Sequence, residues 1–263
     1  MKKLLLCPPT HYDIRYEINP WMNIDNPIDH VKAQEEYKTL TYAYRALDIE
    51  YNELPPVEGL PDQVFTTDLG HAEGNQFIQA NFKYPERQKE ALIASEYFRE
   101  RKFEIKTLPP EIYFEGGDLL KVGKRYLFGY GKRSSYEALP RLEELLDSSI
   151  IAIELPDDTF YHLDTCVAPL SDDIALMNPE ALNDEGLAVL RSTFATCVET
   201  STEDNDKLVC NALPFGTDLI LSAGVSNELK DQLIALGFRI CTVPMTEYLK
   251  GGGGIHCVSL EIL

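Results

Sequence analysis

The sequence lacks several features that would place it in large classes of proteins. None of its 263 residues falls in a run of the roughly 18 apolar residues that a membrane-spanning helix needs. The six cysteines form no CxxC pair, and the apolar part of the N-terminus is too short for a secretory signal. We therefore expect a cytoplasmic protein with no membrane contact and no disulfide framework.

Positive charge is also scarce. The chain has 24 Lys and Arg against 43 Asp and Glu, a formal net charge of −19. Such a protein repels nucleic acid and anionic lipid, so neither is expected as a partner. An acidic field suits a small cationic ligand, although the same charge would also serve solubility alone. The sequence does not fix the oligomeric state, and a homo-oligomer stays open.

What the chain does have is a repeated alternation of helices and strand pairs. Caps, prolines and a terminal glycine predict helices over residues 25–47, 86–101, 135–146, 179–192 and 226–236. Turn residues predict hairpins over 119–128, 166–177 and 212–222. No change in composition marks a linker, so residues 1–263 are predicted to form a single α/β domain.

Five polar residues recur at intervals of 46 to 49 residues, each in or beside a segment typical of a strand. They are Asp68, Glu115, His162, Asn211 and Cys257. A period of this length indicates a repeat architecture. With the N-terminal strand at residues 4–6 completing the last repeat, the pattern predicts a fivefold pseudo-symmetric α/β propeller with one ββαβ-type unit in each blade. Five unrelated αβ units at average spacing are the alternative, and the chemical character of the five residues favours the propeller.

The residue types at these positions suit a covalent hydrolase. Cys257 follows four glycines and needs a partner that helps it form its thiolate. His162 can exchange protons near neutral pH, and Asp164 would share its face of a strand. The carboxylates of Asp68, Glu115 and Asp164 match the N–H fork of a guanidinium. A metal is the rival use of such ligands, but zinc-type spacing is missing, so no metal and no cofactor is expected.

Four motifs in order resemble the guanidino-group-modifying superfamily, which has the pentein fold. The motifs lie at residues 65–68 (FTTD), 114–118 (FEGGD), 162–164 (HLD) and 251–257 (GGGGIHC). The resemblance covers nearly the whole chain, and the superfamily includes arginine deiminase, dimethylarginine dimethylaminohydrolase, arginine dihydrolase and the amidinotransferases. It implies that Arg87 and Arg133 bind the α-carboxylate of the substrate and that Asn19 lies near the substrate.

The resemblance implies hydrolysis of a C–N bond in arginine or an N-methylated arginine. A thiouronium on Cys257 would be the intermediate, and citrulline with ammonia or an amine the products. Asp68 follows the deiminase and dimethylaminohydrolase pattern, whereas Asn19 and residues 16–22 and 81–88 are similar to arginine dihydrolases, which carry asparagine at the position of Asp68. A dihydrolase, which yields ornithine, ammonia and CO2, is therefore an alternative. An amidinotransferase and a non-catalytic binder of similar fold are further ones.

Overall fold

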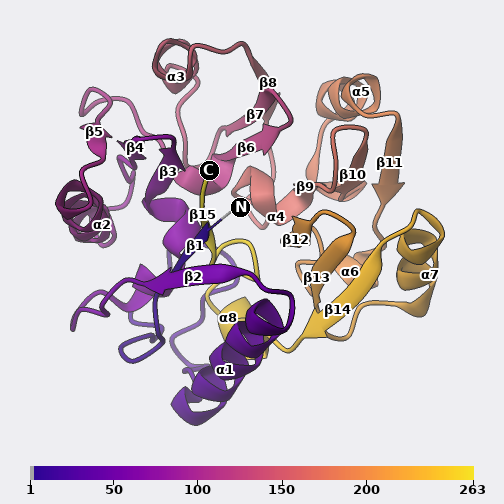
Figure 1. Cartoon of the computed structure of the whole chain (residues 1–263), viewed down its shortest axis with the longest axis horizontal. Coiled ribbons are helices and arrows are strands. Elements are labelled where there is room, and N and C mark those ends of the chain that lie inside the picture. The colour runs from indigo at the N-terminus through magenta and orange to yellow at the C-terminus, as the bar shows by residue number, and fades with distance from the viewer. Residues whose placement is uncertain (1–2) are drawn as a thin grey trace.

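The computed structural model describes residues 3–263 and contains the same small unit five times (Figure 1). In each unit a first strand pairs antiparallel with a second, and the second pairs parallel with a third. A helix connects the second strand to the third, as a parallel connection requires. The five units are β15-β1-α1-β2, β3-β4-α2-β5, β6-β7-α3-β8, β9-β10-α5-β11 and β12-β13-α7-β14.

The first two units share one six-stranded sheet in the order β2-β1-β15-β3-β4-β5. Its strands are β2 (Glu50–Glu53), β1 (Lys3–Leu6), β15 (Leu260–Ile262), β3 (Gly70–Glu73), β4 (Gln76–Gln79) and β5 (Glu104–Lys106). The N-terminal strand pairs antiparallel with the C-terminal one, Leu4 opposite Glu261. The prediction that the C-terminal unit takes up the strand at residues 4–6 is therefore confirmed.

The other three units each form a three-stranded sheet. They comprise β6 (Leu119–Val122), β7 (Arg125–Tyr130) and β8 (Ile150–Glu154); β9 (Val167–Pro169), β10 (Ile174–Met177) and β11 (Thr196–Glu199); and β12 (Leu213–Phe215), β13 (Asp218–Ser222) and β14 (Arg239–Val243). The predicted hairpins coincide with β6–β7, β9–β10 and β12–β13. Gly123 makes the first turn with a φ of 58°, a conformation that glycine adopts at little cost.

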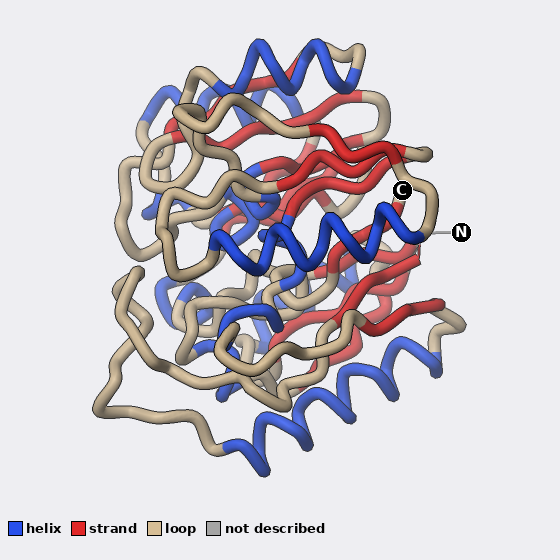
Figure 2. Tube along the Cα trace, turned by 90° about the vertical axis from the view of Figure 1, so that its left-hand side faces the viewer, coloured by secondary structure: helices blue, strands red, loops and turns tan. Residues whose placement is uncertain are grey.

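The long helices lie outside the sheets, and the first strands of the units lie toward the middle (Figures 1 and 2). The helices are α1 (His30–Ala46), α2 (Gln88–Glu100), α3 (Ala138–Leu146), α5 (Asp184–Thr193) and α7 (Asn227–Ala235). Each covers its sheet with an apolar face; for example, Phe98 of α2 stacks on Phe77 of β4 with ring centroids 4.1 Å apart. Within residues 3–263 no helix is both long and apolar enough to cross a membrane.

Three predicted helix boundaries were wrong for local reasons. The first helix begins at His30 rather than near residue 25, because the Asp29 side chain accepts from the backbone N–H groups of Val31 and Lys32. The third begins at Ala138, which puts Pro140 in its first turn, where no N–H is needed. The predicted helix at 179–192 is split into η4 (Pro179–Ala181) and α5, whose N-cap is Asn183.

The five recurring polar residues were predicted to lie in or beside strands, and each lies shortly before the first strand of a unit rather than within a strand. Short helices hold three of these segments: η2 (Thr66–Leu69), η3 (Gly116–Asp118) and α4 (Leu163–Cys166). Asp68 lies within η2, Glu115 directly precedes η3 and His162 precedes α4. Asn211 and Cys257 lie in turns before β12 and β15. The five residues therefore do occupy the same place in successive units, at one end of the first strands.

Candidate active site

The glycine run forms a tight loop between α8 (Thr246–Leu249) and β15 that ends at Cys257. A Cβ on Gly253 would lie 2.3 Å from Phe65 Cε1, and one on Gly251 would lie 2.6 Å from the Tyr12 hydroxyl. Gly252 has a φ of 84°, which favours glycine. The glycines thus make room for the protein's own aromatic side chains, a reason that the sequence did not reveal.

Asn211 forms hydrogen bonds with both the glycine loop and the buried Cys257 thiol. Its Oδ1 accepts from the backbone N–H groups of Gly254 (3.1 Å) and Cys257 (2.9 Å), and its Nδ2 lies 3.0 Å from Cys257 Sγ. The same Nδ2 donates to the backbone oxygen of Asp164 at 3.0 Å. The predicted site set left out Asn211, although the regular spacing had marked it.

Asp164 joins the thiol to a second histidine. Its Oδ2 lies 3.3 Å from Cys257 Sγ and 2.8 Å from Nδ1 of His256. Asp164 belongs to α4, so the strand-face argument that paired it with His162 was wrong, although both side chains do reach the site. Sequence reasoning missed His256, for which its place directly before Cys257 was the available signal.

His162 is fully buried and contacts two predicted carboxylates. Its Nε2 lies 2.9 Å from Glu115 Oε2, and its Nδ1 lies 3.4 Å from Asp68 Oδ1. Burial favours the neutral ring, but Asp68, Asp118 and Glu115 outweigh it and raise the pKa of His162 to about 9. Burial likewise opposes the charge of Glu115, yet Arg133 and His162 lower its pKa to about 2. An imidazolium facing a carboxylate is therefore the expected state at neutral pH.

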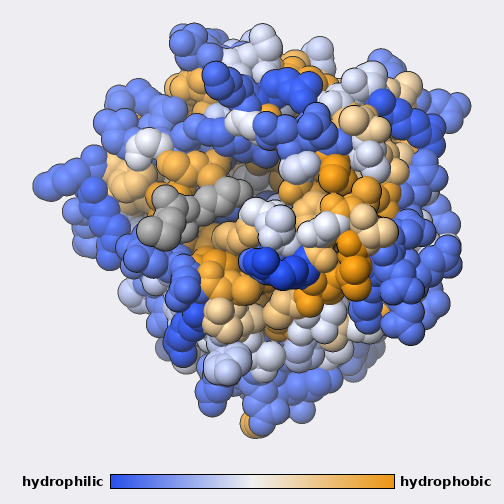
Figure 3. Space-filling model, turned by 45° about the vertical axis from the view of Figure 1, so that its right-hand side comes forward, coloured by the Kyte–Doolittle hydropathy of each residue, from blue (hydrophilic) through white to orange (hydrophobic). Residues whose placement is uncertain are grey.

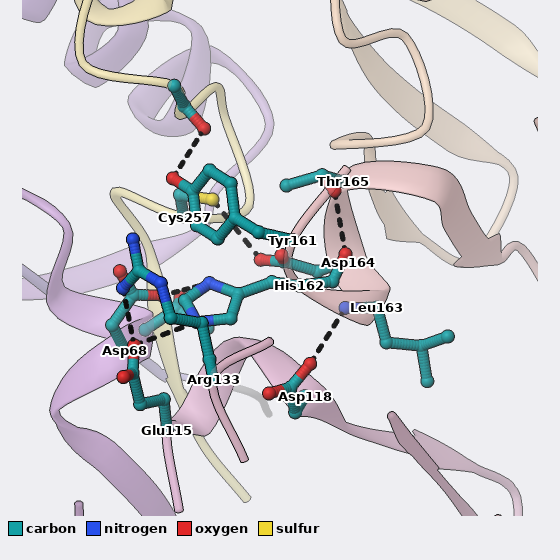
Figure 4. Close-up of polar contacts among 12 residues, drawn as sticks. Asp68, Glu115, Asp118, Arg133, Tyr161, His162, Leu163, Asp164, Thr165 and Cys257 are labelled. Atoms are coloured by element: carbon teal, nitrogen blue, oxygen red, sulfur yellow. Dashed lines mark hydrogen bonds and ion pairs between the residues drawn. The ribbon is translucent and has the colours of Figure 1, made fainter. Parts of the chain in front are cut away.

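The side chains of Asp68, His162 and Asp164 come together at the site (Figure 4), and one polar atom of each lies close to the backbone of Gly117. A Cβ there would lie 2.9 Å from Asp68 Oδ1, 2.9 Å from His162 Nδ1 and 3.1 Å from Asp164 Oδ1. None of the three atoms has a hydrogen-bond partner among the described residues, and the same holds for Glu115 Oε1. Asp68 Oδ1 has only its 3.4 Å ion-pair contact with His162 Nδ1, and Asp164 Oδ1 and Glu115 Oε1 accept no hydrogen bond from the described residues. Buried oxygens of this kind are costly unless something binds them.

Arg87 and Arg133 lie behind these carboxylates. Arg87 donates to Asp68 Oδ2 at 2.6 Å, to Glu90 Oε2 at 2.9 Å and to the backbone oxygen of Asp62 at 3.1 Å. Arg133 donates to Glu115 Oε2 at 2.9 Å and to the backbone oxygen of Ile18 at 3.1 Å. Both arginines are at the site, but their guanidinium groups pair with the site's own acids. Their predicted contact with a substrate carboxylate stays a prediction.

Asn19 and Tyr161 hold the first two glycines of the glycine loop. Asn19 Nδ2 donates to the Gly251 oxygen at 3.0 Å, and the Tyr161 hydroxyl donates to the Gly252 oxygen at 2.9 Å. Asn19 Oδ1 accepts from the N–H of Trp21 at 2.9 Å. All eight residues predicted for the site therefore surround one small region. The structure adds Asn211 and His256.

Two further buried acids, Asp62 and Glu90, surround Arg87 and were not foreseen. Among residues 3–263 Asp62 has the Tyr16 hydroxyl as its only neighbouring hydrogen-bond donor, in a geometry too poor for an ordinary bond, and Glu90 Oε1 has no hydrogen-bond partner. Burial raises the pKa of Asp62, and it raises the pKa of Glu90 to about 8 against the opposing effect of Arg87. No sequence pattern marked Glu90, which lies on α2 next to the exposed residue Lys89.

The thiol of Cys257 is protonated in this arrangement. Burial, Asp164 and Asp68 together raise its pKa well above the usual value. Asp68, Asp164 and Cys257 each offer one ligand atom within 4.8 Å of the others, so they could also hold a metal ion. The two carboxylates suit an organic cation as well as they suit a metal ion. The positive charge of such a cation would favour the thiolate form of Cys257.

The raised pKa of His162 predicts a stability that depends on pH. The free histidine value is 6.5 and the folded value is about 9, so the imidazolium contacts contribute about 3 kcal/mol below pH 6.5. This contribution is lost as the pH rises through 9. Urea unfolding of the wild type and His162→Asn at pH 6, 7, 8 and 9 measures it as a shrinking difference between the two proteins. A difference that does not change with pH would contradict the assignment.

Comparison with known proteins gives consistent matches along the chain. The family model described as N,N dimethylarginine dimethylhydrolase, eukaryotic, matches residues 15–263. The bifunctional arginine dihydrolase/ornithine cyclodeaminase ArgZ of Synechocystis is 35% identical over 99% of this chain, which spans only 37% of that relative. The N(G),N(G)-dimethylarginine dimethylaminohydrolase of Mycobacterium tuberculosis is 31% identical, over 99% of this chain and 86% of its own length.

A solved structure agrees in fold and in the extent of the match. It is a variant of the N-terminal domain of ArgZ covalently bound to a reaction intermediate, with a TM-score of 0.96 and 32% identity. The match covers 100% of this chain and 98% of that domain. The chain belongs to the dimethylarginine dimethylaminohydrolase family, within the guanidino-modifying superfamily that the motifs and their spacing had indicated.

Proposed function

We propose that this protein hydrolyses a C–N bond of a guanidino substrate, arginine or an N-methylated arginine, through a covalent intermediate on Cys257. The observation that carries the proposal is the meeting of Cys257 Sγ with oxygens of Asp68 and Asp164 within 4.8 Å. The oxygens of Asp68, Asp164 and Glu115 that accept no hydrogen bond are acceptors for a planar cation with several N–H donors. The covalent intermediate in the related ArgZ domain supports the same route.

In the proposed mechanism the bound guanidinium promotes formation of the Cys257 thiolate, which is the nucleophile. Burial, Asp164 and Asp68 hold up the pKa of Cys257. A guanidinium between the two carboxylates would offset their effect and favour loss of the thiol proton to solvent, which leaves the thiolate. The thiolate attacks the central guanidinium carbon and forms a C–S bond. As the C–N bond breaks, His162 gives its proton to the leaving nitrogen, and a thiouronium remains on Cys257.

The second half of the reaction reverses the proton transfer. The neutral His162 takes a proton from a water molecule whose oxygen attacks the thiouronium carbon. The C–S bond then breaks and Cys257 leaves as thiolate. The hydroxyl proton of the adduct passes to solvent, and the ureido product, citrulline for an arginine substrate, is released. Glu115, 2.9 Å from His162 Nε2, stabilises the imidazolium that forms again. No cofactor takes part in these steps.

We propose that the remaining part of the substrate is held by Arg87, Arg133 and Asn19. Each arginine has N–H groups beyond those used by Glu90, Asp68 and Glu115, so a substrate carboxylate could join these pairs. Asp62, a buried acid beside Arg87, suits an ammonium group of the same substrate. These roles add Asp62 to the substrate-binding residues that were predicted from the sequence.

The number of C–N bonds that are hydrolysed distinguishes two candidate reactions. Citrulline as the end product follows from the aspartate at position 68, in the deiminase and dimethylaminohydrolase pattern. The alternative is an arginine dihydrolase that continues to ornithine, ammonia and CO2, and the 35% identity to the bifunctional dihydrolase ArgZ favours it. An amidinotransferase would differ from both, because it would form product only with an added amine.

Incubation with arginine, dimethylarginine and agmatine, followed by mass identification of the products, tests the proposal. We expect citrulline from one or both arginine substrates. We expect Asp68→Asn to lower kcat/KM about 10- to 1000-fold, because one partner of a buried charge pair is lost. Ornithine as the wild-type end product would show that Asp68 does not limit the reaction to one bond. No turnover of any guanidine, with or without an amine acceptor, would contradict the proposed function.

We also propose that the five units close into a single fivefold propeller domain over residues 1–263. The recurrence of one strand pattern in every unit and the pairing of β1 with β15 support closure. The six free cysteines fit a reducing cytoplasm. A small guanidino compound is the proposed partner, and sedimentation would decide between a monomer and a homo-oligomer.

A further inference from the structure

Asp118 is a fully buried acid that the proposed mechanism does not use. Hydrophilic residues gather at the periphery of the face shown in Figure 3, where water solvates their charges, whereas Asp118 is 0% exposed. Burial raises its pKa to about 7, against the opposing effects of the His162 charge, the Ser134 hydroxyl and the Leu163 backbone N–H. Burying a carboxylate costs free energy, so the contacts of Asp118 require an explanation.

The first contact of Asp118 is with the backbone next to His162. Its Oδ1 accepts a hydrogen bond from the N–H of Leu163 at 3.0 Å, and Figure 4 shows the carboxylate pointing at that nitrogen. Leu163 is the first residue of α4, and the side chain of its N-cap residue, His162, makes no hydrogen bond to the free N–H groups there. Asp118 therefore supplies, from another unit, the acceptor that a capping side chain usually supplies.

The other contacts of Asp118 lead to Glu115. The backbone N–H of Asp118 donates to the Glu115 oxygen at 3.1 Å. The Ser134 hydroxyl lies beside Asp118 without the geometry of an ordinary hydrogen bond, and it accepts from the Glu115 N–H at 3.0 Å. Glu115 and His162 belong to different units, yet their side chains meet at 2.9 Å. Asp118 thus joins the two segments that carry this pair.

A glycine of β7 makes room for the Asp118 carboxylate. A Cβ at Gly129 would lie 2.8 Å from Asp118 Oδ1 and 2.8 Å from Leu163 Cβ, on the two residues that the hydrogen bond brings together. Gly129 does not have a positive φ, so its backbone would accept an L-residue without strain. The absence of a side chain at this position therefore leaves space for the contact between Asp118 and α4.

We propose that Asp118 is a positioning residue that holds α4 against η3, so that the His162 imidazole lies between Glu115 and the reacting nitrogen of the substrate. This inference rests on the proposed function. His162 gives a proton to the leaving nitrogen and later takes one from water, so both half-reactions depend on where its ring lies. Asp68 and Glu115 contact that ring directly, whereas Asp118 acts on the backbone from which the ring extends.

Asp118→Leu, which removes the acceptor, and Asp118→Asn, which keeps it, test the role. We expect Asp118→Leu to lower kcat about 100-fold, as a misplacement of about 1 Å does. KM should change by less than about threefold, because Asp118 does not touch the side chains proposed to hold the substrate. Asp118→Asn should lower kcat by no more than about 10-fold, since its amide oxygen can still accept from Leu163. A crystal structure of Asp118→Leu should show the His162 ring more than about 3.2 Å from Glu115, outside normal hydrogen-bond reach.

Gly129→Ala tests the same contact without replacing Asp118, because the added Cβ would crowd its carboxylate. It should lower kcat to a value between those of the two Asp118 variants, and it gives the same readings if Asp118→Leu fails to fold. Asp204→Leu is the matched control. Asp204 is a buried acid that accepts from the Ser226 N–H at 2.7 Å, and its charge is not among those that shift the pKa of His162. Its loss should reduce stability but leave kcat and KM within about twofold.

Three results would overturn the positioning role. They are a wild-type kcat in Asp118→Leu, equal losses of kcat in Asp118→Leu and Asp118→Asn, and a His162 ring that keeps its 2.9 Å contact with Glu115 in the crystal structure of Asp118→Leu. The crystallographic result does not depend on turnover. A wild-type protein that hydrolyses no guanidine would therefore contradict the proposed function alone, while the position of the His162 ring still decides the role of Asp118.

Discussion

Cys257→Ser is expected to lower kcat/KM by about 10⁴-fold or more while the protein stays folded, as loss of a covalent nucleophile does in other enzymes. A serine hydroxyl is far harder to deprotonate than a thiol, and two neighbouring carboxylates make its anion less favourable still. The Asn211 contacts to the backbone of Gly254 and Cys257 do not use the sulfur, so the loop should keep its shape. Substrate binding should therefore survive.

Steady-state assays and calorimetric titration with the best guanidine measure the two halves of this prediction. Cys241→Ser is the control, because Cys241 is a half-buried residue of β14 on the outer part of its unit. It should change kcat/KM by less than about twofold, as is usual for changes away from a site. Turnover by Cys257→Ser at the wild-type rate would rule out a covalent route. Binding without turnover in the wild type itself would favour the non-catalytic binder.

Arg87→Met is expected to destabilise the fold by about 3–5 kcal/mol, the usual cost of removing one partner from a buried ion pair. Arg87 is 3% exposed and contacts the carboxylates of Asp68 and Glu90. Methionine keeps the length of the side chain but leaves these acids, with Asp62 nearby, without a cation. The acids would then take up protons on folding, so the loss of stability should be smaller at pH 5 than at pH 8.

Urea unfolding at these two pH values measures the loss. Adding Glu90→Gln should recover part of the loss at pH 8 and little at pH 5, because folding no longer has to protonate this buried acid. Arg99→Met, which breaks the exposed pair with Glu96 on the same helix, should cost less than about 1 kcal/mol. A loss of similar size in Arg87→Met and Arg99→Met would show that the buried acids around Arg87 do not depend on its charge.

The repeat could be predicted from the sequence because turn and cap residues act on neighbouring residues of the chain. Turn residues such as Gly123 and caps such as Ser226 mark the ends of elements locally, and the spacing of polar residues marks their recurrence. The errors in helix boundaries and in secondary-structure type arose where two neighbouring residues or two conformations fitted the same sequence pattern. Asp25 precedes a proline and imitates a cap, but Asp29 is the residue whose carboxylate binds the first turn of α1. The segment around His162 is apolar enough for a strand, yet it forms the short helix α4.

The sequence predicted which types of residue form the active site, but it predicted only some of the contacts between them. The sequence by itself determined five similar units, a cysteine after a glycine run and an excess of carboxylates, because these follow from composition, spacing and local propensity. Only the tertiary structure decided that Asn211 binds Cys257, that Asp164 joins Cys257 to His256 and that Asp62 and Glu90 surround Arg87. It also decided the raised pKa values of His162 and Cys257. Such features depend on distances between different units and on exclusion of water, neither of which exists until the chain has folded.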